Sequence, residues 1–139
     1  MDRVFLDANV LFSAAYPSGA GLQRLWKLAE AQLLASSYAV EEARRNLSRP
    51  SQKARLTRLL RTVNFVAEPD DLTLPTAIEL PVKDRPILAA AIAAKATHLL
   101  TGDIKHFGRY FGRSIAGVLI LPPADYLQSR EPDQSESDR

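Results

Sequence analysis

Residues 84–103 read DRPILAAAIAAKATHLLTGD and contain a helix pattern followed by a strand pattern. Asp84-Arg85-Pro86 is a typical helix start, because proline is tolerated in the first turn. The helix that it predicts, through Ala94, is apolar on most sides, so we expect it to lie buried against a sheet. His98 to Thr101 then predicts a short strand. This succession favours an α/β fold.

The same alternation extends along the rest of the chain. Further strands are predicted at residues 4–6, 33–35, 63–67 and 118–121, and further helices at 21–32, 38–47, 51–60 and 122–128. The polar, proline-marked residues 69–81 are expected to connect two of these elements. Strands that alternate with helices indicate a mostly parallel sheet.

Length and composition limit the classes of protein. A chain of 139 residues predicts one domain, at 1–128, and the apolar-free residues 129–139 predict a flexible acidic tail. The absence of cysteine excludes disulfides and thiolate zinc sites, and two histidines give little support to a histidine zinc site. No membrane span or secretory segment is recognisable, so we expect a cytoplasmic protein.

The positive charge is concentrated in one segment, although the net charge is only +2. No acidic residue interrupts the basic residues between Ala43 and Asn64, which are Arg44, Arg45, Arg49, Lys53, Arg55, Arg58 and Arg61. Arginine favours phosphate, which indicates contact with a nucleic-acid backbone. A solvated helix face is an equally good interpretation.

Four acidic residues fall where an α/β topology brings ligands. Asp7 and Asp103 follow predicted strands, Asp84 begins a helix, and Glu42 lies within about two turns of a helix start. Each taken singly is also a common cap, turn or surface residue. Taken together, crowded carboxylates need a cation, and an all-oxygen cluster selects Mg²⁺ or Mn²⁺. Such ions serve phosphoryl chemistry.

The sequence resembles the PIN-domain family, small metal-dependent ribonucleases that include the VapC-like toxins of bacterial toxin–antitoxin pairs. The resemblance spans residues 4 to about 127. It rests on four motifs, VFLDANVL (4–11), EARRNL (42–47), KDRPILAAA (83–91) and LTGD (100–103) followed by His106-Phe107.

The resemblance implies a three-layer α/β/α domain with a mostly parallel central sheet. By position it implies a catalytic quartet, Asp7, Glu42, Asp84 and Asp103, with Asp7, Asp84 and Asp103 as metal ligands and Asn9 and Thr101 as supporting residues. Glu41 remains a rival to Glu42, because both flank the same apolar helix stripe. Some relatives carry an additional acid shortly after the last aspartate, whereas Ile104, Lys105 and His106 follow Asp103 here.

The resulting hypothesis is a Mg²⁺- or Mn²⁺-dependent endoribonuclease, the toxin of a toxin–antitoxin pair. Its expected partners are RNA, which Arg44, Arg45, Arg55, Arg58 and Arg61 would contact, and a cognate antitoxin. Trp26 is expected to pack in the core or in a homodimer. The alternatives are a non-catalytic RNA- or partner-binding module of the same fold, and a carboxylate-dependent phosphatase that begins at Asp7.

Overall fold

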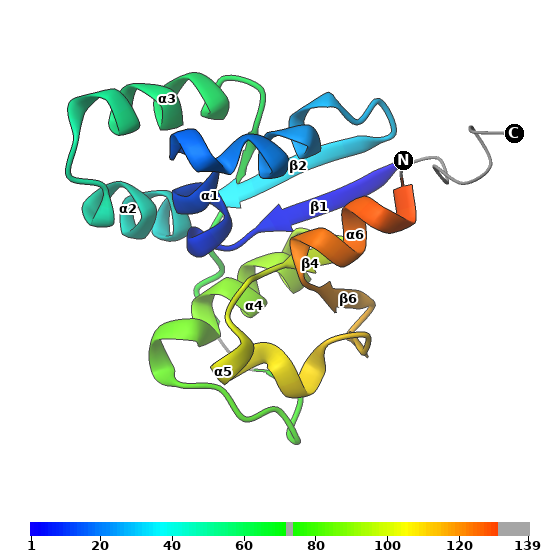
Figure 1. The fold of residues 1–139 in the computed structure, drawn as a ribbon. Coiled ribbons are helices and arrows are strands. Elements are labelled where there is room, and N and C mark those ends of the chain that lie inside the picture. The colour runs from blue at the N-terminus through cyan, green and yellow to red at the C-terminus, as the bar shows by residue number, and fades with distance from the viewer. Residues whose placement is uncertain (72–73, 131–139) are drawn as a thin grey trace, which may run out of the picture.

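The computed structural model describes residues 1–71 and 74–130, except for the side chains of residues 17–20. Its centre is a six-stranded sheet in the order β3-β2-β1-β4-β6-β5 (Figure 1). The strands are β1 (Asp2–Leu6), β2 (Ala31–Ser36), β3 (Asn64–Val66), β4 (His98–Leu100), β5 (Ser114–Ile115) and β6 (Val118–Leu121). All neighbouring strands are parallel except β5 and β6. The predicted mostly parallel sheet is therefore confirmed.

Helices cover the sheet and complete a three-layer α/β/α fold, as predicted. The α-helices are α1 (Ala8–Ala14), α2 (Ser37–Asn46), α3 (Pro50–Leu60), α4 (Arg85–Ala93), α5 (Ile104–Phe107) and α6 (Pro123–Arg130). The 3₁₀ helices are η1 (Pro17–Lys27), η2 (Val82–Asp84) and η3 (Gly108–Tyr110). Helix η1 contacts both α1 and α6, and α2 contacts α4. Among the described helices, none is both long and apolar enough to cross a membrane.

The core lies between the sheet and these helices. Val4, Phe5 and Leu6 of β1 are fully buried, because β1 is a central strand with a helix layer on either face. The alanine-rich face of α4 is also buried, including Ala90 and Ala91. Its small side chains allow close approach to the sheet, which agrees with the prediction for residues 84–94.

In the N-terminal half, one predicted helix was wrong and one helix was missed. The helix predicted at 21–32 is instead the 3₁₀ helix η1, which ends at Lys27, because Ala31 and Gln32 pair with β1 as the start of β2. Ala29 is exposed and so is not part of the apolar stripe. Helix α1 was not predicted. Asp7 starts it as the N-cap, with its side chain accepting a hydrogen bond from the Ala8 amide.

The C-terminal boundary differs from the prediction by two residues. Ser129 and Arg130, which were assigned to the flexible tail, belong to α6. The Arg130 guanidinium pairs with Asp2 at 2.8 Å, and the Tyr126 hydroxyl donates to the same carboxylate at 2.8 Å. These contacts hold the end of α6 to the start of β1. The rest of the predicted tail, 131–139, lies outside the described residues.

Candidate functional site

The candidate site lies at the topological switch point of the sheet, where the strand order reverses. From β1 the chain proceeds outward to β2 and β3, and it then returns to add β4 on the other side of β1. The helices that follow β1 and β4 therefore diverge and leave a crevice at the carboxyl edge, which is the usual ligand position in such sheets. Asp7 and Asp103 flank this crevice, and the Asp7 amide donates to the Leu100 carbonyl at 3.1 Å.

Asp7 is a buried carboxylate held by three donors. Its Oδ1 accepts from the Ala8 amide at 2.6 Å, and its Oδ2 accepts from the Thr101 hydroxyl at 2.8 Å and from Asn9 Nδ2 at 3.2 Å. Asn9 Oδ1 accepts in turn from the Gly102 amide at 2.8 Å. Asn9 and Thr101 thus fix the position of Asp7, and the structure places both of them beside it.

Asp84 and Asp103 meet at His106. Asp103 caps α5, and its Oδ1 accepts from the His106 amide at 3.1 Å. His106 Nδ1 lies 2.8 Å from Asp103 Oδ2 and 3.0 Å from Asp84 Oδ2. The Asp84 Oδ2 atom is nevertheless buried without a hydrogen bond. These three residues form a cluster with metal-ligand spacing in the described part of the chain.

The structure distinguishes the two neighbouring glutamates of α2. Glu42 is half-buried and lines the same cleft as Asp7, Asp84 and Asp103, whereas Glu41 is exposed and does not line it. Helix α2 begins directly after β2, where Ser36 caps it by accepting from the Ala39 amide at 3.2 Å, and its residues Glu42 and Asn46 line the cleft. The geometry therefore favours Glu42, as proposed from its position before Ala-Arg-Arg.

The cleft that these acids share has a volume of about 610 Å³. Its lining includes all four predicted acidic residues together with Asn9, Phe12, Ser13, Asn46 and Lys83. The sequence reasoning did not select Ser13, Asn46 or Lys83. Lys83 precedes Asp84 directly, and Asn46 lies four residues after Glu42, so helical spacing was the available signal for Asn46.

The environment of the cleft disfavours the ionised forms of Asp7 and Asp84. Burial, followed by the charges of Asp84 and Glu42, raises the pKa of Asp7 to about 6, against hydrogen bonds from Thr101 and Ala8 that lower it. Burial also raises the pKa of Asp84, with further contributions from Asp103 and Glu42, and His106 opposes this. A cation in the cleft would reverse both effects.

The donor set fits a hard divalent cation. The cleft offers carboxylate oxygens from four different parts of the chain, and the buried Asp84 Oδ2 accepts no hydrogen bond although His106 Nδ1 lies 3.0 Å away. Oxygen ligands of this kind suit Mg²⁺ and Mn²⁺ better than zinc. His106 was not selected as a ligand, but its Nδ1 lies within reach of Asp84 and Asp103. In the sequence, the signal for a contact between His106 and Asp103 was their spacing of three residues at the start of α5.

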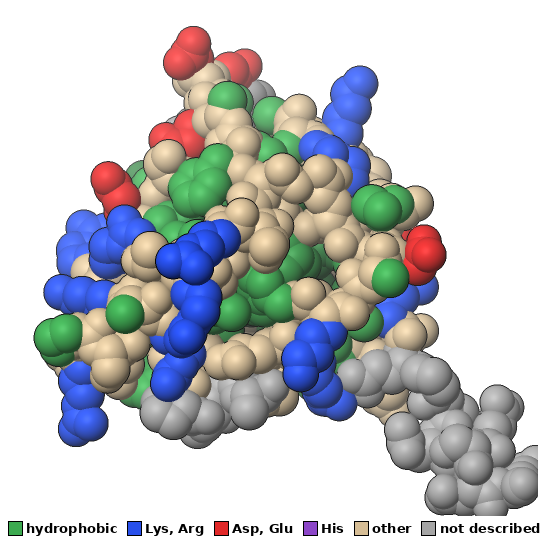
Figure 2. Space-filling view, turned by 90° about the horizontal axis from the view of Figure 1, so that it is seen from above, with side chains coloured by type: hydrophobic (Ala, Val, Ile, Leu, Met, Phe, Trp, Pro, Cys, Tyr) green, Lys and Arg blue, Asp and Glu red, His purple; other side chains and the backbone are tan. Residues whose placement is uncertain are grey.

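The predicted basic residues are largely on one surface. Arg44, Arg45, Arg58 and Arg61 are exposed. Figure 2 shows Lys and Arg side chains gathered over the α3 side of the molecule. Arg55 differs, because it is half-buried and its Nη1 donates to the Ala15 carbonyl at 2.8 Å.

Trp26 is partly buried against the core, and its Nε1 donates to the Leu59 carbonyl at 2.8 Å. This position agrees with the core-packing interpretation of Trp26. The predicted homodimer stays a prediction.

A family model and several solved structures match this chain. The family model of the PIN domain matches residues 3–105, well over half of the chain. No curated protein matches the sequence.

Solved structures share the fold at low sequence identity. VapBC2 from Rickettsia felis, crystallised with a DNA fragment from their promoter, has a TM-score of 0.67 at 18% identity, over 86% of this chain and 98% of the other. Mycobacterium tuberculosis VapC20, a toxin that cleaves the sarcin–ricin loop, has a TM-score of 0.55 at 14% identity, over 73% and 91%. FitAcB from Neisseria gonorrhoeae has a TM-score of 0.51 at 18% identity, over 87% and 98%.

Proposed function

The chain belongs to the PIN-domain family, and from this premise we propose that it is a divalent-metal-dependent endoribonuclease that acts as the toxin of a toxin–antitoxin pair in the cytoplasm. The observation that carries the proposal is the convergence of Asp7, Glu42, Asp84 and Asp103 on one cleft. These residues come from four separate parts of the sequence. Mutual repulsion makes such a cluster costly unless a cation occupies it.

Asp7, Asp84 and Asp103 are the residues that would hold Mg²⁺ or Mn²⁺. Glu42 lines the same cleft and adds a fourth carboxylate to it. A bound divalent ion supplies Lewis acidity, which lowers the pKa of water and offsets negative charge on a phosphodiester.

The other residues of the site position Asp7, accept a proton or add positive charge. Thr101 and Asn9 hold Oδ2 of Asp7, and the Ala8 amide holds Oδ1, so the carboxylate keeps one orientation. Glu42 lies on a different element, α2, and its half-buried carboxylate is available to accept a proton from an attacking water. Lys83 adds a positive charge at the cleft, where a phosphate would bind.

RNA is the substrate that the surface charge supports. The exposed arginines of α2 and α3 can contact backbone phosphates, and Figure 2 shows Lys and Arg side chains gathered over the α3 side of the molecule. VapC20, which shares the fold, cleaves an RNA loop, and VapBC2 is a related assembly. A cognate antitoxin is therefore part of the proposal.

The residue two positions after Asp7 argues against the phosphatase alternative. Asn9, where such enzymes use an acid, is engaged with Asp7, Thr101 and Gly102.

Incubation of the purified chain with a mixed RNA pool, in Mg²⁺ or in EDTA, tests the proposal. We expect discrete cleavage ends that require Mg²⁺ and that disappear with Asp7→Asn. An RNA pool that stays intact in Mg²⁺ and in Mn²⁺, from a folded protein that binds neither ion, would support the non-catalytic module instead.

A further inference from the structure

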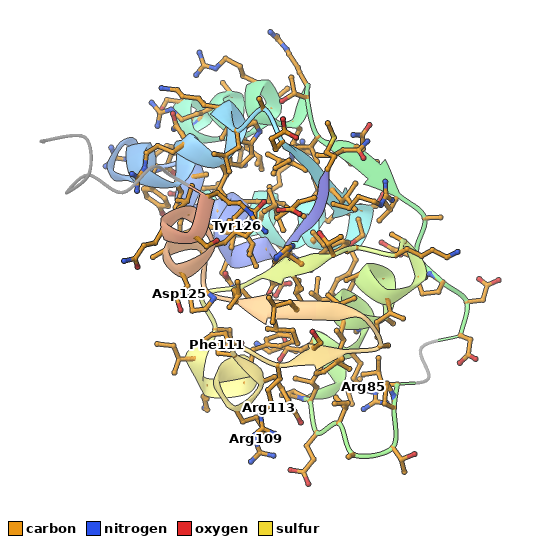
Figure 3. All side chains as sticks on the ribbon, turned by 90° about the vertical axis from the view of Figure 1, so that its right-hand side faces the viewer. Arg85, Arg109, Phe111, Arg113, Asp125 and Tyr126 are labelled. Atoms are coloured by element: carbon orange, nitrogen blue, oxygen red, sulfur yellow. The ribbon has the colours of Figure 1, made fainter. Side chains whose placement is uncertain are left out.

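A second pocket lies beside the acidic cleft and has the opposite charge. Its volume is about 390 Å³, and its lining is Ile78, Glu79, Leu80, Pro81, Arg85, Lys105, His106 and Arg109. Arg85 begins α4, Lys105 belongs to α5, and Arg109 belongs to η3. Figure 3 labels Arg85 and Arg109, which both lie in the lower half of that view.

The positive charge of this pocket is mostly uncompensated. Glu79 is the acidic residue in its lining, and it already pairs with Arg109 at 2.6 Å. Neither Arg85 nor Lys105 forms an ion pair with another described residue. Arg85 is half-buried and Lys105 is exposed, so both can meet a ligand that enters from solvent.

His106 connects the two sites. Its ring contacts Asp84 and Asp103, which line the acidic cleft, and the same residue lines the basic pocket. Arg85 follows Asp84 directly in the sequence, and Lys105 lies two residues after Asp103. The cleft and the pocket are therefore neighbours, and one polymer can contact both.

We propose that this pocket, formed around Arg85 and Lys105, is a subsite for a backbone phosphate of the RNA strand next to the phosphate that is cleaved. The inference rests on the proposed nuclease function, and it adds a substrate contact on the α4–α5 side of the site. Arg85 and Lys105 bind the phosphate as charge-assisted donors. They hold the strand on the far side of His106 from the scissile bond.

The apolar part of the lining supports RNA over an acidic protein segment. Ile78, Leu80 and Pro81 form one side of the pocket, and they offer an apolar surface to a ribose or a base. In an RNA strand each phosphate is flanked by riboses and bases, so one strand can place a phosphate on Arg85 and Lys105 and a base on this apolar surface.

The test is the RNA affinity of the double variant Arg85→Gln/Lys105→Gln. Binding of a short, fluorescein-labelled single-stranded RNA is measured by anisotropy in EDTA, over a series of KCl concentrations. We expect binding about tenfold weaker than that of the unchanged chain. The slope of log K against log salt should flatten by about 0.7 for each phosphate that the variant no longer neutralises.

A matched control removes the same charge from the opposite edge of the sheet. Lys27 ends η1 before β2, and Lys95 lies between α4 and β4, so Lys27→Gln/Lys95→Gln should bind RNA like the unchanged chain. Circular dichroism melts of both variants exclude unfolding as the cause of weaker binding.

Three other outcomes overturn one claim or the other. If the unchanged chain cleaves RNA but Arg85→Gln/Lys105→Gln keeps its affinity and salt slope, the subsite is wrong and the nuclease proposal stands. The same holds if the double variant loses only the binding of a polyglutamate peptide, which would assign the pocket to a protein. If the unchanged chain neither binds nor cleaves RNA, the proposed function itself fails.

Discussion

The Thr101 hydroxyl donates a hydrogen bond of 2.8 Å to Oδ2 of Asp7, and so joins the exit of β4 to the exit of β1. The same hydroxyl oxygen accepts from the Asp103 amide at 3.1 Å. One buried side chain therefore positions two of the proposed metal ligands. This relationship explains why a threonine stands before Gly102-Asp103.

Thr101→Val keeps the shape of the side chain but removes three hydrogen bonds of the hydroxyl, which it makes with Asp7, the Asp103 amide and Asn9 Nδ2. The Asp103 amide is left without this partner, and Asp7 Oδ2 keeps only Asn9. We expect the free energy of unfolding to fall by about 1–3 kcal/mol, measured by urea denaturation. Thr57→Val is the control, because exposed Thr57 donates only within α3, and it should change stability by less than about 0.5 kcal/mol. Equal losses for the two variants would contradict this role of Thr101.

The raised pKa of Asp7 predicts how stability depends on pH. Between the ordinary pKa of 3.8 and the folded value of about 6, the folded chain holds a proton that the unfolded chain has released. The free energy of unfolding in EDTA should therefore fall as pH rises through this window, by up to about 3 kcal/mol from this group, and level off above it.

Asp7→Asn removes the titrating group, so its stability curve should lose this part of the slope. Denaturation in EDTA at several pH values between about 4 and 7 measures the difference. Asp125→Asn, at an exposed position of α6, is the control and should keep the slope of the unchanged chain. Parallel curves for the unchanged chain and Asp7→Asn would mean that Asp7 ionises normally.

Glu41 and Glu42 form a matched pair for testing the catalytic quartet. Glu42 lines the cleft and Glu41 does not, although both lie on α2. We expect Glu42→Gln to lower the rate of RNA cleavage by about 10²- to 10⁴-fold, which is typical for a residue that accepts a proton in the transition state. Glu41→Gln should cleave like the unchanged chain. A larger loss for Glu41→Gln would reverse the assignment.

The prediction for the basic surface concerns Arg58 and Arg61. Arg55 stays unchanged in this test, because its bond to the Ala15 carbonyl gives it a role in packing. Arg58→Gln/Arg61→Gln should weaken binding to all RNA sequences alike and reduce the salt dependence, as measured by anisotropy. If RNA binding is preserved while binding to a co-purifying protein is lost, the surface belongs to a partner.

The main features of the site could be predicted because they depend on local patterns. Asp7 and Asp103 closely follow apolar strands, and the parallel topology brings such exits to one edge. Helical phase could not separate Glu41 from Glu42, because the direction of α2 relative to β1 depends on tertiary packing. The contact of His106 with Asp84 was equally hidden, since the two residues are 22 positions apart in sequence.

The errors in secondary structure have similar causes. The spacing of Leu22, Leu25 and Trp26 resembles an α-helix, but pairing of Ala31 and Gln32 with β1 limits the segment to η1. Helix α1 has only seven residues, too few for a clear apolar period, and Asp7 acts both as its cap and in the site. The two-residue strand β5 has no pattern that a sequence could reveal.

The central claim is that the acidic cleft holds a divalent cation through its aspartates. Titration of the purified chain with Mn²⁺, followed by the electron paramagnetic resonance signal of the free ion, tests it without any substrate. We predict saturable binding by the unchanged chain and by Asp125→Asn, and loss of that binding in Asp7→Asn. Equal binding by the unchanged chain and Asp7→Asn, or no binding by either, would contradict the assignment of this cleft as a metal site.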